Sequence, residues 1–132
     1  MNSVFSKLIN GELPCNKVAE TGEFLAFLDI NPNTLGHTLC IPKKQEDKIF
    51  DLSESEYIRL LSFTRKVALA LRKSVKCERI GMSVIGLEVS HVHIHLIPIN
   101  SLDDITFQKK TEINSRMMTK TANEIFSNFN VQ

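Results

Sequence analysis

The sequence from position 91 to 98 reads His91-Val92-His93-Ile94-His95-Leu96-Ile97-Pro98. Side chains of a β-strand alternate between its two faces. As a strand, this stretch places its three histidines on one face and its apolar residues on the other, where they can pack into a core. The β-branched residues favour a strand over a helix, and Pro98 is expected to end the strand or lie at an edge. The segment therefore predicts a core strand that presents three imidazoles on one side.

Three histidines on one strand face are hard to explain by packing alone. Positive charges on all three would lie about 7 Å apart and repel one another, so we expect some of them to be neutral near pH 7. Neutral imidazoles act as metal ligands, nucleophiles or proton carriers. One interpretation is a zinc site that His37 completes. The other is nucleophilic attack on phosphorus, giving a phosphoramidate intermediate, while a neighbouring imidazole assists the leaving oxygen.

The rest of the chain alternates short helical and extended segments. Ser53 and Glu56 form a capping-box pattern before the longest apolar helical repeat, and Gly11 is placed to end the first helix. The expected helices cover residues 3–10, 54–74 and 112–128, and the expected strands cover residues 17–20, 23–28, 37–41, 79–85 and 88–97. Because most neighbouring strands are joined by turns, antiparallel pairing and the α+β class are predicted.

Composition limits the classes of function. The chain has 132 residues and a mass of 15.0 kDa, which predicts one domain over residues 1–132. Its net charge of +1 gives no general reason to expect a nucleic-acid partner. We find no apolar run of membrane-spanning length and no signal-peptide core, so we expect no membrane partner. None of the three cysteines forms a CxxC pair, which favours a reducing, cytoplasmic location.

Three segments, in order, resemble the histidine triad (HIT) family. HVHIHLIP (91–98) is similar to the family's signature of three histidines alternating with apolar residues. FLDINP (27–32) and GHTLCIPKK (36–44) resemble its DINP and GHTLVIPKK stretches, and VFSKLINGELPCNKVAE (4–20) resembles its IFxKIIxGEIPxxKVxE opening. Within the family, the chain looks most like the bacterial Hint-like and diadenosine polyphosphate hydrolase-like branch. The resemblance covers residues 3–100 and leaves residues 101–132 as a C-terminal helical extension.

The resemblance implies a fold and a reaction. The fold is a five-stranded antiparallel sheet with a long central helix, a short N-terminal helix and a C-terminal helix, commonly in a homodimer. The reaction is attack on the α-phosphate of purine nucleoside phosphoramidates or dinucleoside polyphosphates through a nucleotidyl-histidine intermediate, with no metal or other cofactor. Some relatives hold a structural zinc with an N-terminal CxxC and a histidine after PKK. This chain has Ser3, Ser6 and Gln45 there, so we expect no metal.

The resemblance also assigns roles by position. His93 matches the nucleophile, His95 the residue that contacts the phosphate and helps the leaving group, and His91 the residue that orients the nucleophile. His37 matches a fourth histidine behind the triad, and Asp29 a ligand of the ribose hydroxyls. Apolar residues that would otherwise be read as core are expected to wall the base pocket: Phe5, Leu8, Leu13, Phe27 and Ile30.

The sequence departs from the family pattern beside the triad. Many members have Gly-Gln-(Ser/Thr)-Val there, whereas this chain has Gly86-Leu87-Glu88-Val89-Ser90. Leu87 cannot donate a hydrogen bond, and strand alternation predicts that Glu88 and Ser90 face away from the triad. An arginine common after the triad is also missing. Leu87 and Glu88 keep one alternative open, a nucleotide-binding or scaffold protein with little catalysis. The histidine cluster keeps a second one open, a metal-dependent enzyme that uses His37 and the triad.

Overall fold

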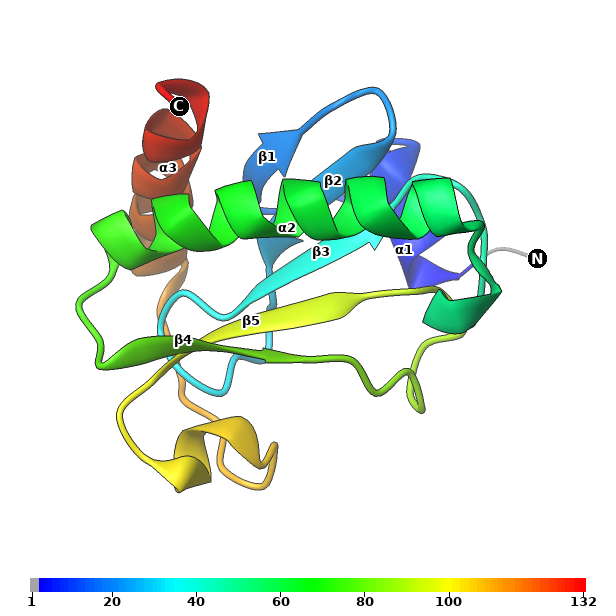
Figure 1. The fold of residues 1–132 in the computed structure, drawn as a ribbon. Helices are drawn as coiled ribbons and strands as arrows, with labels where there is room; N and C mark the ends of the chain where they lie inside the picture. Colours follow the sequence, from blue (N-terminus) through cyan, green and yellow to red (C-terminus); the bar gives the residue numbers. More distant parts are fainter. Residues whose placement is uncertain (1–2) are drawn as a thin grey trace.

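The computed structural model describes residues 3–132 and is built around one five-stranded sheet (Figure 1). The strands are β1 (Lys17–Glu20), β2 (Phe24–Leu28), β3 (Thr38–Pro42), β4 (Arg79–Ser83) and β5 (Ile94–Ile99), in the order β1-β2-β3-β5-β4 with antiparallel neighbours. The helices are α1 (Val4–Ile9), α2 (Glu54–Ser74) and α3 (Ser115–Asn130), with 3-10 turns η1 (Ile49–Asp51) and η2 (Leu102–Ile105). This arrangement confirms the α+β class and the five-stranded antiparallel sheet.

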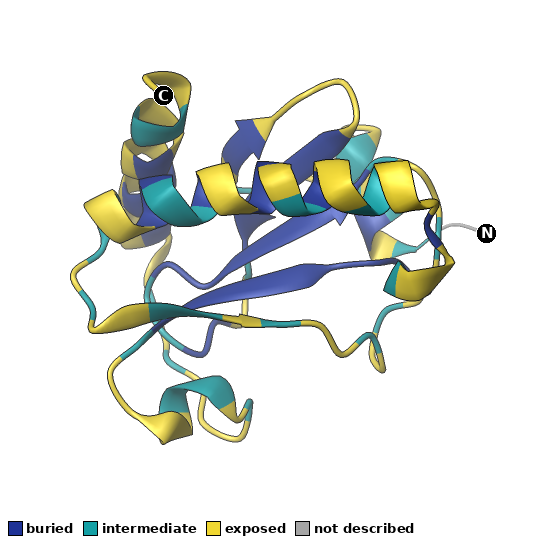
Figure 2. Ribbon diagram, viewed as in Figure 1, coloured by how far each residue is buried: buried dark blue, intermediate teal, exposed yellow. Residues whose placement is uncertain are grey.

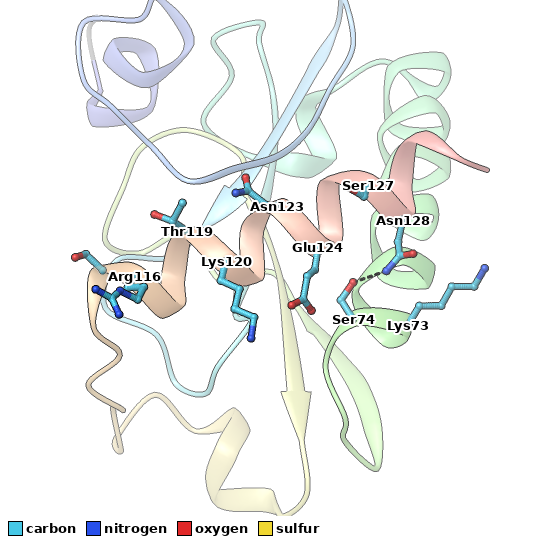
Figure 3. A pocket seen from close by; sticks show the side chains of 10 residues that line it. Lys73, Ser74, Arg116, Thr119, Lys120, Asn123, Glu124, Ser127 and Asn128 are labelled. Carbon is cyan, nitrogen blue, oxygen red and sulfur yellow. Dashed lines mark hydrogen bonds between the residues drawn. The ribbon is translucent and has the colours of Figure 1, made fainter.

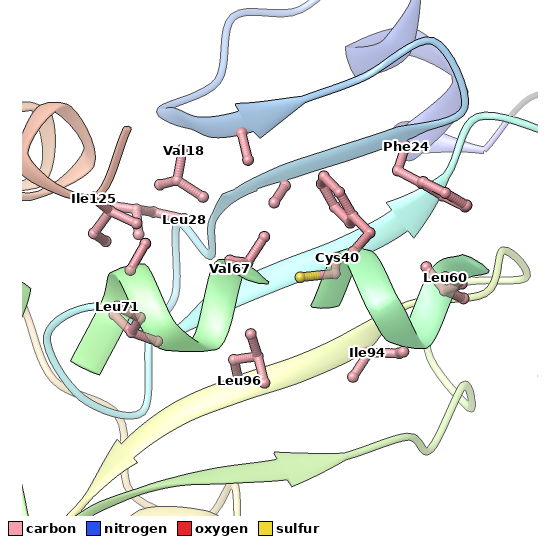
Figure 4. Packing of buried hydrophobic residues seen from close by; sticks show 14 of the residues in the cluster. Val18, Phe24, Leu28, Cys40, Leu60, Val67, Leu71, Ile94, Leu96 and Ile125 are labelled. Carbon is pink, nitrogen blue, oxygen red and sulfur yellow. The ribbon is translucent and has the colours of Figure 1, made fainter. Parts of the chain in front are cut away.

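Helices α2 and α3 cover one face of the sheet and enclose the larger core (Figure 4). The predicted capping box at Ser53 and Glu56 begins α2. The apolar stripe of α2 then packs on alternate residues of the strands, including Ile94 and Leu96 of β5. Because side chains alternate along a strand, this packing turns His95 to the opposite face of the sheet.

The opposite face carries a smaller apolar cluster beneath α1. Phe5 of α1 packs with Leu25 and Phe27 of β2 and with Leu39 and Ile41 of β3. The central strands β2 and β3 are therefore buried on both faces (Figure 2). His95 is paired directly with Leu39, so its side chain lies beside this second cluster.

The predicted strand over 88–97 is wrong in its first half. Strand β5 begins only at Ile94, and His91 and His93 precede it in irregular backbone. The reason is that β4 ends at Ser83, which is paired with His95, so residues 84–93 have no β4 partner. Val92 is still buried in the α2 core, and its N–H bonds to the carbonyl of Glu46 at 2.8 Å.

A tight turn sets the position of His37 at the start of β3. Gly36 has a φ of +92°, and a Cβ there would meet side-chain atoms of Val75, Leu71 and Pro98 at 3.0–3.2 Å. Only glycine allows this backbone to lie so close to α2 and β5. The His37 carbonyl then accepts the Asp29 N–H at 2.9 Å, which brings the end of β2 beside the histidine.

None of the helices within residues 3–132 has both the length and the apolar content that a membrane-spanning helix requires.

Candidate active site

A hollow of about 240 Å³ lies where the chain enters β5. Its lining includes Asp29, Glu88, His93, His95, Phe107 and Lys110. The four histidines around it are almost fully buried, from 0 % exposure for His37 to 7 % for His95. His93 also lines a neighbouring groove of about 500 Å³, and residues 85–87 border both spaces. His93 therefore borders two spaces, and a ligand bound at His93 has room on two sides.

Hydrogen bonds fix which nitrogen of His37 and His95 carries a proton. The backbone N–H of Asn33 lies 3.0 Å from His37 Nδ1 and can only donate, so Nδ1 accepts. Neutral His37 therefore has its proton on Nε2, which lies 3.0 Å from His95 Nδ1. His95 Nδ1 accepts this proton in a hydrogen bond, and the proton of neutral His95 is on its other nitrogen, Nε2.

Two backbone carbonyls determine which nitrogen of His91 and of His93 donates a hydrogen bond. The His91 carbonyl lies 2.7 Å from His93 Nδ1 and can only accept, so Nδ1 carries a proton, and in the neutral ring Nε2 keeps its lone pair. The Pro42 carbonyl similarly accepts from His91 Nε2 at 2.8 Å. Phe5 packs edge-on against both rings, at centroid distances of 5.9 and 5.1 Å. His93 is thus oriented with one unprotonated nitrogen free for chemistry.

Burial favours the neutral form of His37, His91 and His95. It lowers the pKa of His37 from 6.5 to about 3 and that of His95 to about 4, and neighbouring positive groups add to both shifts. It also lowers the pKa of His91. Burial raises the pKa of Asp29, although a hydrogen bond from the Asn31 N–H to its carboxylate acts in the opposite direction. These directions agree with the expectation that the cluster is not fully protonated near pH 7.

The residues at the zinc positions of some relatives bond to one another instead. The Ser6 hydroxyl donates to Gln45 Oε1 at 2.7 Å, and Gln45 Nε2 donates to the Ser90 carbonyl at 3.2 Å. Ser3 Oγ lies 3.4 Å from His91 Nδ1 and caps α1. Hydroxyl and amide groups are not the thiolate and imidazole ligands that structural zinc uses. This donor set does not fit zinc, and it connects α1 to the triad by hydrogen bonds.

A second possible ligand set consists of Asp29, His37 and His95, whose ligand atoms lie within 4.8 Å of one another. A metal at His37 Nε2 requires that nitrogen to lose its proton, so that the proton of a neutral ring moves to Nδ1. Nδ1 already faces the Asn33 N–H, and two donors would then oppose each other. The arrangement fits a hydrogen-bond chain and does not fit a metal site.

The structure brings together some of the expected residues and separates others. His37, His91, His93, His95 and Asp29 converge on one region. The five expected base-wall residues are all described, and none of them lines the hollow beside His93: Phe5 and Phe27 are buried, Leu8 is half-buried, and Leu13 and Ile30 are exposed.

The expected orientation of Glu88 is wrong. Glu88 lines the hollow together with His93 and does not face away from the triad. The alternation rule fails because residues 84–93 are not a strand, so the backbone is free to turn between Glu88 and His93. Leu87 is 90 % exposed.

Sequence reasoning missed three residues of this region: Asn33, Phe107 and Lys110. The Lys110 ammonium donates to Asn33 Oδ1 at 2.8 Å and lies 5.0 Å from the centre of the Phe107 ring. That ring packs against His95 and His37 at 4.7 and 5.8 Å. Asn33 lies beside the DINP stretch, which was a usable signal. Phe107 and Lys110 lie in the segment beyond the resemblance, and no local pattern marks them.

A larger polar groove of about 870 Å³ lies between α3 and the end of α2 (Figure 3). Lys73, Arg116 and Lys120 contribute positive charge and Glu124 negative charge, while Asn128 donates to Ser74 Oγ at 2.9 Å. The groove contains none of the four histidines. The smaller hollow, which His93 and His95 line, is therefore the candidate active site.

Comparisons with known proteins identify the family and agree with this fold. Residues 10–102 match the family model described as the HIT domain. An uncharacterized HIT-like protein of Borreliella burgdorferi is 36 % identical over 118 residues, which cover 84 % of this chain and 85 % of that protein. Adenosine 5′-monophosphoramidase hnt1 of Schizosaccharomyces pombe is 37 % identical over 99 residues, with 74 % of each chain covered.

Solved structures give the same result. A crystal structure of a Hit-like protein from Bartonella henselae matches with a TM-score of 0.83 and 29 % identity, covering 96 % of each chain. The fold and the buried histidines thus define an α+β protein of the histidine triad class. This chain belongs to the HIT family, as the sequence motifs predicted.

We expect the free energy of unfolding to fall as the pH drops from about 6.5 toward about 3. Because burial lowers the pKa of His37 and His95, the unfolded chain binds more protons than the folded chain in this window. Each such histidine contributes a slope of up to about 1.4 kcal/mol per pH unit. Urea unfolding at several pH values should show the slope decrease by about that amount in His37→Gln. An unchanged slope would contradict the neutral state of folded His37.

Proposed function

We propose that this protein is a hydrolase or nucleotidyltransferase that attacks the α-phosphate of purine nucleoside phosphoramidates through a nucleotidyl-His93 intermediate. One observation carries the proposal: the His91 carbonyl accepts a hydrogen bond from His93 Nδ1, so the neutral ring has its lone pair on Nε2, and His93 lines the hollow. An oriented, unprotonated imidazole of this kind is an activated nucleophile.

The proposed reaction has two steps. His93 Nε2 attacks phosphorus and forms an N–P bond, while the bond from phosphorus to the leaving amine breaks and the amine takes up a proton from solvent. Water then cleaves the N–P bond: its hydroxyl joins phosphorus, and its other proton returns to solvent. This gives a nucleoside monophosphate and restores His93. His95 lines the hollow and has its proton on Nε2, so it is placed to donate a hydrogen bond to the phosphate or the leaving atom. His91 orients the nucleophile through its carbonyl.

The family comparison supports this reaction class, since one relative bears the name adenosine 5′-monophosphoramidase. Nucleotide binding by Asp29 and by the base wall remains a prediction from the resemblance. The base-wall residues are Phe5, Leu8, Leu13, Phe27 and Ile30. No metal enters the proposed steps, and the Asn33 N–H at His37 Nδ1 supports that choice. The single domain and the cytoplasmic location also stay predictions.

Glu88 favours amides over polyphosphates among the possible substrates. Glu88 lines the same hollow as Asp29 and His93, and its negative charge adds to the effect of burial in raising the pKa of Asp29. Each further phosphate of a polyphosphate tail brings negative charge, which a neighbouring carboxylate repels. An amine leaving group brings none. We therefore place phosphoramidates ahead of dinucleoside polyphosphates as substrates.

A homodimer is proposed through the outer edge of the sheet. In the described part of the chain, β4 pairs with β5 alone, and Met82 on β4 is 60 % exposed. Val84, Ile85 and Leu87 continue this exposed apolar stretch. Unpaired edges with apolar side chains tend to pair with another chain, and a second copy supplies a matching edge.

Replacing His93 with alanine should reduce the release of AMP from adenosine 5′-phosphoramidate by roughly a thousandfold or more, because the attacking nitrogen is lost. Product formation is measured by chromatography, with and without a metal chelator, and AMP binding is measured in parallel by calorimetry. Turnover by the variant near the wild-type rate would disprove the mechanism. Intact AMP binding without turnover in the wild type would favour the binding-protein alternative.

Glu88→Gln should raise kcat/KM for a diadenosine polyphosphate by roughly fivefold, since removing one carboxylate near a phosphate is worth about 1 kcal/mol. The rate with adenosine 5′-phosphoramidate should change much less. Glu78→Gln, at an exposed position outside the hollow, is the matched control. Equal effects on both substrates would show that Glu88 does not select against the polyphosphate tail.

The dimer proposal predicts that the wild type sediments at twice the chain mass of 15.0 kDa. Met82→Lys should shift the protein toward the monomer, because a charge would be buried at the paired edge. Leu102→Lys replaces another exposed apolar residue on η2 and should leave the mass unchanged. A monomeric wild type at micromolar concentration would refute the dimer.

A further inference from the structure

The charge balance of the hollow beside His93 is unfavourable for a phosphate. Two carboxylates line it, those of Asp29 and Glu88. Of the described residues in its lining, Lys110 is the only lysine or arginine. A bound phosphate adds further negative charge, so its binding depends on a source of positive charge close by.

The two coupled imidazoles are poor sources of that charge. If His95 were protonated, its Nδ1–H would face the Nε2–H of His37, and two donors would oppose each other across 3.0 Å. His37 cannot move its proton to Nδ1, because the Asn33 N–H already occupies that side. Burial adds to this effect by lowering the pKa of both rings. His95 can donate a hydrogen bond as a neutral ring, but the chain of bonds opposes a positive charge on it.

Lys110 is held in place by several contacts. Its ammonium donates to Asn33 Oδ1 at 2.8 Å and lies 5.0 Å from the centre of the Phe107 ring. The next residue, Thr111, donates its N–H to the Pro32 carbonyl at 2.9 Å and its hydroxyl to the Asn33 carbonyl at 2.8 Å. Asn33 is itself only 2 % exposed. These bonds reduce the entropy that a free lysine side chain would lose on binding an anion.

Phe107 fixes the path of this segment. It adopts a φ of +65°, which is strained for a residue with a side chain. In this conformation its ring packs on His95 and His37 and also lies near the Lys110 ammonium. The strained turn therefore carries Lys110 to the same hollow that His93 and His95 line.

We propose that Lys110 is the cation that binds the substrate phosphate in this site, and that the strained turn at Phe107 positions it there. The identity of the ligand, a nucleoside monophosphate ester or amide, rests on the proposed function. The ammonium retains donors beyond the one given to Asn33, and these are available to phosphate oxygens. Lys110 thus takes the place of the arginine that is missing after the triad.

The test compares AMP with adenosine, which differ by the phosphate. Calorimetry on the full chain should show that Lys110→Met weakens AMP binding by about ten- to hundredfold, as expected for loss of a charged hydrogen bond. Adenosine binding should stay within about twofold, and Lys110→Arg should retain most of the AMP affinity. Lys109→Met, at an exposed position next to it and outside the hollow, should change neither.

Equal loss of AMP and adenosine affinity in Lys110→Met would overturn the inference, because it would indicate a purely structural role. Unchanged AMP binding would also overturn it. The proposed function is tested separately by phosphoramidate turnover of the wild type. Lys110-dependent AMP binding without turnover would uphold this inference and reject the proposed reaction. Turnover that does not respond to Lys110→Met would uphold the proposed reaction and reject this inference.

Discussion

The hydrogen bond from the Asn33 backbone N–H to His37 Nδ1 sets the direction of the chain of bonds behind the site. A backbone amide can only donate, so the proton of His37 must lie on the side of His95. His95 must then accept at Nδ1 and keep its own proton on Nε2. Because the donor belongs to the backbone, a change of the Asn33 side chain does not remove this bond. One peptide group thereby determines which nitrogen of a second imidazole can donate to a ligand.

The sheet makes this chain of bonds possible because both of its faces are covered. On one face, Leu96 packs beneath α2, and the pairing of β3 with β5 turns His95 to the other face. On that face α1 supplies Phe5, which packs against the ring of His93. Burial removes the rings of His37 and His95 from water, and this is the main reason why their pKa values are lowered. The apolar packing and the protonation of the site therefore have the same structural origin.

Much of the fold followed from local sequence patterns. The capping box at Ser53, the helical repeat that follows it and the alternation around His95 all act over a few residues, so they are visible in one dimension. The start of β5 was not predictable in this way, because it depends on where β4 ends. The prediction of the orientation of Glu88 failed for the same reason. The direction of its side chain depends on the absence of a strand partner for residues 84–93 and not on its sequence neighbours.

The site was predictable only as far as the motifs reach. The motif stretches contain the four histidines. Lys110, however, forms a hydrogen bond with Asn33, which is 77 positions away, and no local pattern predicts that contact. Phe107 could not be placed either, because nothing in its neighbours indicates a positive φ. Contacts of this kind are set by tertiary packing, which a single sequence does not display.

The charge arrangement connects the site to a class of substrate. Asp29 and Glu88 leave the hollow with more negative than positive side chains, and Lys110 can compensate one phosphate group. On the proposed function, the reacting phosphate takes that cation, and any further phosphate faces Glu88 without a partner. An amine leaving group avoids this repulsion, because it takes up a proton as it leaves and departs without negative charge. With Lys110 as the one lysine or arginine among the described lining residues, and with His37 and His95 favoured as neutral rings, the proposed function predicts a preference for substrates with a single phosphate over polyphosphate chains.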